Sequence, residues 1–164
     1  MSLYPLATGN KWTYKSKDGS LWSNSITGPD GTGGFTMLNS VTGKSAVMQQ
    51  DGDNYLTDAY EPGKMGITLK ENAKAGDTWE VHFVANGIQS ILVMTVKETG
   101  MSKTVEGKSY SDVVFIEADS KMNMNGNVMS LNFFTQYYYA KGTGLILTTS
   151  SYGDSHALVE VELK

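Results

Sequence analysis

The side chains that could carry out acid–base chemistry include two histidines and seventeen carboxylates. The stretch Gly153-Asp154-Ser155-His156 places an acid, a hydroxyl and an imidazole next to one another, the three groups of a hydrolytic triad. A working triad needs its nucleophile on a strained turn, an oxyanion hole, and a base brought in from elsewhere in the fold. Neighbours on one turn do not supply these features, so we expect a solvated turn and no catalytic residue here.

Metal sites and paired carboxylates are weakly indicated. A two-histidine site would require the fold to bring His82 to His156, and Glu160 and Glu162 have the spacing of a solvated strand face. The acidic stretch that begins at Asp51 lacks the glycine and the final glutamate of a calcium loop. We therefore expect no metal and no cofactor, and read the Asp51 stretch as a hairpin turn.

Phosphate and nucleic-acid chemistry are disfavoured. The two "GKS" stretches, 43–45 and 107–109, have Leu38 and Ser102 where a phosphate-binding loop needs another glycine. The formal net charge is −4, and all thirteen basic residues are lysines. Without arginine there is no bidentate recognition of phosphate, so we expect no nucleic-acid partner.

Length and composition fit one globular domain that spans residues 1–164. Hydrophobic residues make up 40% of the chain and charged residues 18%, a balance that supports a packed core. The sequence has no cysteine, which excludes disulfides and thiolate chemistry, and no apolar run is long enough to predict a membrane span. No signal sequence is visible, and we expect residues 1–3 to be an expression scar or disordered.

Glycine-containing turns recur at short intervals, and the segments between them are rich in β-branched and aromatic residues. This pattern predicts an all-β antiparallel meander of about 10–13 strands with little helix. So many strands would leave exposed edges in a flat sheet, which favours a strongly curved half-barrel or a closed barrel. The turn signals are Asp18-Gly19, Asp30-Gly31, Thr42-Gly43, Asp51-Gly52, Pro62-Gly63, Asn86-Gly87, Asn125-Gly126, 142–144 and Gly153-Asp154.

Two hairpins are predicted most clearly. Asn86-Gly87 and Asn125-Gly126 each lie between β-rich runs, and Asn-Gly favours the tight turns that join antiparallel strands. Near the C-terminus, residues 157–163 alternate so that Ala157 and Val159 share one face, which predicts a half-buried strand.

The aromatic run "YYYAKGTGLI" raises the question of a ligand site. Alternation places Tyr137 and Tyr139 on one strand face with Phe133, and Tyr138 on the other face. We expect the first set to face the interior, where the rings either belong to a packed core or line a ligand pocket. The candidate ligand-lining residues are Trp12, Tyr14, Phe133, Tyr137 and Tyr139.

Three segments resemble a known group of proteins. The segment 4–14, "YPLATGNKWTY", resembles the opening Y-P-x-x-x-G-x-x-W-x-Y of bacterial secreted proteins and lipoproteins that are largely uncharacterised. The segment "YYYAKGTGLI" resembles the Y-Y-A-x-G-x-G-L-I stretch near their C-terminus, and 104–117 resembles a middle strand. The resemblance implies an all-β extracytoplasmic domain, in the periplasm or at the cell surface. It also implies a lipid anchor on a cysteine upstream of the fold, which this sequence does not contain.

Three functions remain open. The first is a non-enzymatic cell-envelope domain that binds an apolar small molecule or an envelope protein, with Met122, Met124 and Met129 of one hairpin covering the mouth of a cavity. The second is a structural or protein–protein interaction module with a filled core. The third, a hydrolase of envelope glycans or peptides, would need a cleft with facing carboxylates or a histidine oriented by an acid.

Overall fold

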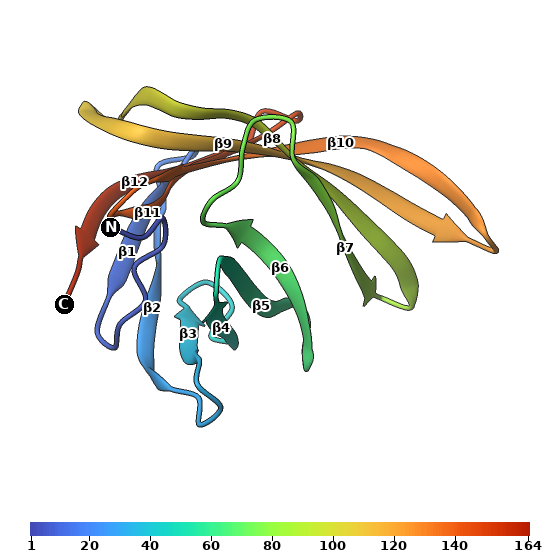
Figure 1. Cartoon of the computed structure of the whole chain (residues 1–164), viewed down its shortest axis with the longest axis horizontal. Helices are drawn as coiled ribbons and strands as arrows, with labels where there is room; N and C mark the ends of the chain where they lie inside the picture. The colour runs from blue at the N-terminus through green and yellow to red at the C-terminus, as the bar shows by residue number, and fades with distance from the viewer.

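The protein is described by a computed structural model that covers residues 1–164. It forms twelve antiparallel strands in one strongly curved sheet and has no helix (Figure 1). The strands are β1 (Lys11–Ser16), β2 (Leu21–Pro29), β3 (Phe35–Asn39), β4 (Ser45–Asp51), β5 (Asn54–Glu61), β6 (Lys64–Lys70), β7 (Thr78–Ala85), β8 (Ile88–Val105), β9 (Lys108–Met124), β10 (Asn127–Ala140), β11 (Gly144–Ser150) and β12 (Ser155–Glu162). The predicted all-β, strongly curved meander is confirmed.

The sheet consists of two meanders joined by the first and last strands. The spatial order is β6-β5-β4-β3-β2-β1-β12-β11-β10-β9-β8-β7, so β1 pairs with β12 and the chain termini lie together. The two edges, β6 and β7, are consecutive in sequence. They come close without a shared ladder, which makes the sheet a nearly closed barrel.

Side-chain contacts join the two edges of the sheet along the seam between β6 and β7. The Trp79 indole N–H on β7 donates to the Ile67 carbonyl on β6 at 2.9 Å, and the Val84 N–H donates to the Glu61 carboxylate at 2.6 Å. Gly66 leaves room for Val81, because a Cβ on Gly66 would lie 2.8 Å from a Val81 methyl. These contacts protect two edges that would otherwise expose unpaired backbone groups.

One end of the barrel is covered by the N-terminal segment. Leu3 is only 2% exposed, and its N–H donates to the Glu71 carboxylate at 2.9 Å. The Ser2 carbonyl accepts a hydrogen bond from the Gly142 N–H at 2.7 Å. Burial of Leu3 and these hydrogen bonds hold Ser2 and Leu3 against the sheet.

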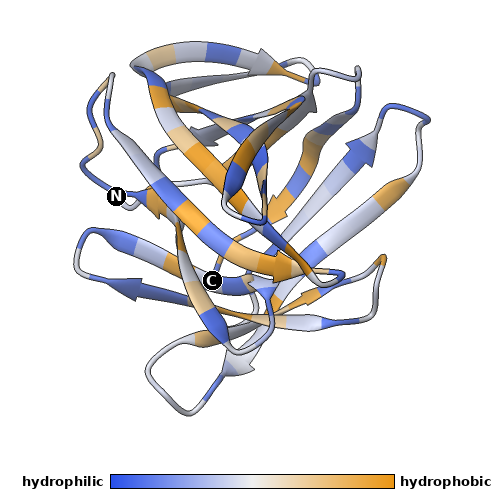
Figure 2. Ribbon diagram, turned by 90° about the vertical axis from the view of Figure 1, so that its right-hand side faces the viewer, coloured by the Kyte–Doolittle hydropathy of each residue, from blue (hydrophilic) through white to orange (hydrophobic).

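Hydrophobic and polar residues alternate along many strands (Figure 2), but bulges interrupt the alternation. Opposite Thr13 and Tyr14 the pairing skips one residue of β12. Leu158, opposite Tyr14, and Val161, opposite Trp12, both face the interior, whereas Val159 is 42% exposed, so the predicted alternation through residues 157–163 is interrupted at this bulge. A bulge adds one residue to one strand and reverses the faces beyond it.

Candidate functional site

A cavity of about 460 Å³ lies inside the barrel, between the strands of the first meander and β10–β11. Its volume falls within the range of about 300–1,000 Å³ that is typical of small-molecule sites. The lining residues are Tyr4, Asn24, Met37, Asn39, Thr42, Lys44, Ser45, Ala46, Met48, Thr57, Asp58, Ala59, Tyr60, Pro62, Thr68, Tyr137, Tyr139 and Leu145.

The inner end of the cavity is apolar and closed. Tyr4, from the N-terminal segment, packs against Tyr139 with ring centroids 6.0 Å apart and against Tyr55 at 6.4 Å. The Tyr55 hydroxyl donates to the Glu71 carboxylate at 2.7 Å. Burial, reinforced by this hydrogen bond, raises the pKa of Tyr55 to about 12. Tyr55 does not itself line the cavity, but it packs behind Tyr4, which does.

Three further tyrosines form part of the wall. The Tyr60 hydroxyl donates to the Thr68 hydroxyl at 3.0 Å. Burial raises the pKa of Tyr137 and Tyr139 well above the usual range of a phenol, so both rings are neutral. No hydrogen bond joins the Tyr137 hydroxyl to another group of the protein, yet it is not sealed from solvent. Tyr137 therefore offers a free hydrogen-bonding group to the cavity.

The outer end of the cavity is polar and lies at the β3–β4 and β5–β6 turns. The Asp58 carboxylate on β5 accepts hydrogen bonds from the Val47 N–H at 2.7 Å and the Gly63 N–H at 3.2 Å, which fixes β4 to the β5–β6 turn. Lys44 is exposed and takes part in none of the ion pairs of the protein. The rim therefore presents one unpaired cation, whereas the charge of Asp58 is stabilised by the backbone.

The structure separates the predicted ligand-lining residues. Tyr137 and Tyr139 line the cavity. Trp12 and Tyr14 do not line it: they are fully buried in the core, where the Trp12 indole donates to the Thr143 carbonyl at 2.7 Å and the Tyr14 hydroxyl to the Leu145 carbonyl at 2.8 Å. These hydrogen bonds hold β1 against the β10–β11 turn and the start of β11.

Phe133 also lies away from the cavity. It keeps the strand face of Tyr137, because Phe133 pairs with Ser120 and Tyr137 with Ile116 in one continuous register. Phe133 does not line the cavity, however, and its ring instead packs against Tyr152, with ring centroids 5.0 Å apart. Alternation therefore predicted the strand face of Phe133 correctly, but it did not predict that Phe133 lies outside the cavity.

Most of the cavity wall was missed by sequence reasoning. Met37, Met48 and Tyr60 come from β3, β4 and β5, which are short strands with mixed polarity. Their inward position depends on pairing between strands: Met37 lies opposite Ile26, and Met48 lies opposite Thr57. The only local indication in the sequence was spacing: the lining residues are two positions apart on β3, at Met37 and Asn39, and on β4, at Ala46 and Met48.

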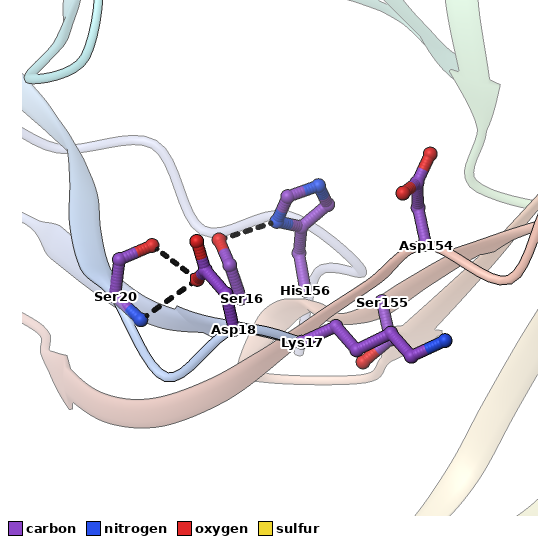
Figure 3. A pocket seen from close by; sticks show the side chains of 7 residues that line it. All are labelled: Ser16, Lys17, Asp18, Ser20, Asp154, Ser155 and His156. Atoms are coloured by element: carbon purple, nitrogen blue, oxygen red, sulfur yellow. Dashed lines mark hydrogen bonds between the residues drawn. The ribbon is translucent and has the colours of Figure 1, made fainter.

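The "GDSH" stretch lies in a shallow polar depression at the β1–β2 and β11–β12 turns (Figure 3). The Ser16 hydroxyl lies 3.0 Å from His156 Nδ1, and the Trp22 indole N–H donates to the same nitrogen at 3.2 Å. Because an indole N–H only donates, Nδ1 must be an acceptor, and the proton of the neutral imidazole is on Nε2.

This arrangement opposes catalysis by Ser16. If Nδ1 removed the Ser16 proton, the new N–H would point at the Trp22 N–H, and two donors would face each other. No hydrogen bond joins Asp154 to His156, so no acid orients the imidazole (Figure 3). His82 bonds only to Glu80 at 2.8 Å on an exposed strand face, and no group of three His, Cys, Asp or Glu side chains is placed to hold a metal.

Comparisons with known proteins give a fold and no family. No family model matches the sequence, and no curated protein matches it. Two crystal structures share the fold over nearly the whole chain. One is a "putative lipoprotein" from Parabacteroides distasonis ATCC 8503, with a TM-score of 0.57 and 13% identity over 98% of both chains. The other is a "putative exported protein with YmcC-like fold" from Bacteroides fragilis NCTC 9343, with a TM-score of 0.58 and 10% identity over 99% of both chains. The protein contains no helix that could cross a bilayer, and its nearly closed twelve-stranded sheet is similar to the fold of these two Bacteroidetes proteins.

Proposed function

We propose that this chain is a non-enzymatic domain of the bacterial cell envelope that binds an amphiphilic small molecule inside the barrel. The observation that carries the proposal is the cavity itself: about 460 Å³, closed at one end by Tyr4 and open at the other. At roughly 30 Å³ for a group of about the size of a water molecule, this space accepts on the order of ten to fifteen methylene-sized groups. The extracytoplasmic location is supported by the sequence resemblance and by two fold neighbours described as a lipoprotein and an exported protein.

The polarity of the cavity indicates how the ligand lies. Tyr4, Met37 and Tyr139 are buried at the inner end, which suits an alkyl chain, whereas Lys44 is exposed at the rim. A ligand with an alkyl tail and an anionic head would place its tail against the inner residues and its head beside Lys44. The Tyr137 hydroxyl could bond to a polar group partway along the chain.

The direct test is binding of dodecanoate to the purified protein, followed by NMR titration. Ala46 lines the cavity on β4, so Ala46→Phe should fill the space and abolish binding, and Ala85→Phe, on a strand end that does not line it, should leave binding unchanged. Absence of binding to the wild-type protein, or equal binding to Ala46→Phe, would refute the proposal. Native mass spectrometry of protein from its own organism would then identify the retained molecule.

The charge preference is tested separately. Lys44→Gln should weaken dodecanoate binding about two- to fivefold, the usual size of one exposed charge contact, and leave dodecanol binding unchanged. Lys17→Gln provides the control, because Lys17 is an exposed lysine at the same end of the barrel that does not line the cavity. Equal effects of the two substitutions would refute the anionic head and leave the apolar site in place.

A protein–protein interaction module is the second candidate. Large apolar side chains are exposed on the projecting ends of hairpins β7–β8 and β9–β10, among them Val84, Ile88 and Val128. An interaction module would retain an envelope protein through these ends and would bind dodecanoate no better than Ala46→Phe does. A hydrolase is disfavoured because His156 Nδ1 accepts a hydrogen bond from the Trp22 indole N–H, which opposes its use as a base toward Ser16.

A further inference from the structure

Three of the nine methionines lie within eight residues, at the projecting end of the β9–β10 hairpin. Met122 and Met124 are two residues apart on β9 and therefore share one face of the strand. Met129 on β10 lies directly opposite Met122 in the antiparallel register. All three side chains consequently project from the same face of the hairpin.

These side chains can bring their sulfur atoms together. Directly opposed residues have Cβ atoms about 4.5–5.5 Å apart, and diagonal neighbours about 7–8 Å apart. Each methionine sulfur is two bonds beyond Cβ, on a side chain with three rotatable bonds. Small rotamer changes would therefore allow the thioethers of Met122, Met124 and Met129 to meet at one point.

Packing does not explain the cluster. Met124 and Met129 are 50% and 51% exposed, and none of the three belongs to the hydrophobic core or packs against it. The hairpin extends beyond the barrel beside the β7–β8 hairpin (Figure 1). Met124 and Met129 are therefore open to solvent, and Met122 is half-buried beside them.

The surroundings select the kind of ligand. The neighbours on this face are uncharged: Ser90 lies opposite Met122, and Asn127 lies opposite Met124. A site of three neutral thioethers without carboxylate or imidazole is a soft donor set, which suits Cu(I) and is unsuited to Zn(II), Ca(II) or Mg(II). A leucine would supply a similar apolar side chain without a donor atom. A methionine supplies a sulfur donor, and the sulfurs of Met122, Met124 and Met129 can meet at one point.

We propose that Met122, Met124 and Met129 form a surface site for a soft monovalent cation, Cu(I), with Ag(I) as its redox-inert analogue. Binding is simple coordination by three neutral thioethers, with no electron transfer and no proton release. The site is separate from the barrel cavity, whose methionines, Met37 and Met48, come from other strands and are buried. The two proposals can therefore fail independently.

The test is titration of the protein with Ag(I), followed through the methionine methyl signals in NMR. One equivalent should shift the signals of Met122, Met124 and Met129 together and leave that of Met65, an isolated exposed methionine on β6, in place. Anaerobic Cu(I) should compete for the same site. Shifts that include Met65, or that continue beyond one equivalent, would show unspecific thioether binding and overturn the proposal.

A triple substitution of Met122, Met124 and Met129 by leucine separates the metal site from an apolar contact surface. Leucine preserves the apolar area and removes the sulfur atoms. Loss of Ag(I) and Cu(I) binding with an unchanged thermal melt is the expected result, and Met65→Leu should bind as the wild type does. Retained metal binding in the triple variant would overturn the proposal.

Discussion

The two meanders use the same antiparallel topology to build different structures. Strands β1–β6 have five to nine residues, whereas β8, β9 and β10 have 18, 17 and 14. The short strands end at a common rim and form most of the cavity wall. The long strands continue past that rim as projecting hairpins (Figure 1). Strand length thus decides whether the concave face of the sheet is covered by a core or left open to solvent.

The long strands follow the barrel only because bulges bend them. The β8–β9 ladder shifts register at three places between Val96 and Lys103. Asp112, just before a pair of adjacent buried valines, Val113 and Val114, has a positive φ of 52°. Val113 and Val114 then pair in regular register with Ala140 and Tyr139, so they lie on opposite faces of β9 and both faces are covered there. Irregular pairing therefore makes strands of this length compatible with a small barrel.

The largest expected effect is on the barrel interior, at alkaline pH. The unfolded chain loses its phenol protons near pH 10. The folded chain retains them to higher pH, because burial raises the pKa of its interior tyrosines. Burial raises the pKa of Tyr55 to about 12 and also raises the pKa of Tyr4, Tyr14, Tyr137 and Tyr139. Stability should be complete below about pH 10 and fall as the pH rises through 12. Circular dichroism and tyrosinate absorbance should change together. Early, gradual ionisation of every tyrosine in a folded protein would contradict the closed interior.

Trp12→Ala should remove a large part of the stability, because Trp12 links strand β1 of the first meander to the β10–β11 turn of the second. Trp12 is fully buried on β1, and its indole bonds to the Thr143 carbonyl. Truncating such an aromatic costs about 3–5 kcal/mol of unfolding free energy. Ile88→Ala, at the projecting end of β8, should cost much less. Urea melts with similar midpoints for the two variants would contradict the prediction that truncation in the core costs more stability than truncation in the projecting hairpin.

The seam offers a smaller, matched comparison. Gly66→Ala should cost about 1–3 kcal/mol, because the new methyl would overlap Val81 between β6 and β7. Gly28→Ala on β2 meets no atom within 4 Å and should be neutral or stabilise by up to about 1 kcal/mol. A chemical melt measures both. Equal effects would mean that the two edges do not press against each other at Gly66.

Local turn chemistry could be predicted from the sequence, and pairing between strands could not. Asn86 and Asn125 both have positive φ, 52° and 53°, and each begins the tight turn that the Asn-Gly pair predicts. The position of Val159 depends on a bulge opposite β1, and that of Met37 on its pairing with Ile26. Neither partner is near in sequence. Alternation therefore predicted the inward faces of Tyr137 and Tyr139 but not the wall opposite them.

The smallest predicted effect concerns Tyr138, between the two inward tyrosines. It lies on the outer face of β10, where its ring stacks on Phe115 with centroids 4.6 Å apart and the Lys103 ammonium sits 4.6 Å above it. The ring is thus partly buried by its neighbours on that face. Aromatic stacking contributes about 0.5–1.5 kcal/mol, so Tyr138→Ala should cost about that much, well below the cost of Tyr139→Ala. Ligand binding should not change in Tyr138→Ala, because the ring points away from the cavity. A loss of dodecanoate binding in this variant, with a melt like that of wild type, would place the ligand on the outer face of the sheet and reverse the assignment of inside and outside on β10.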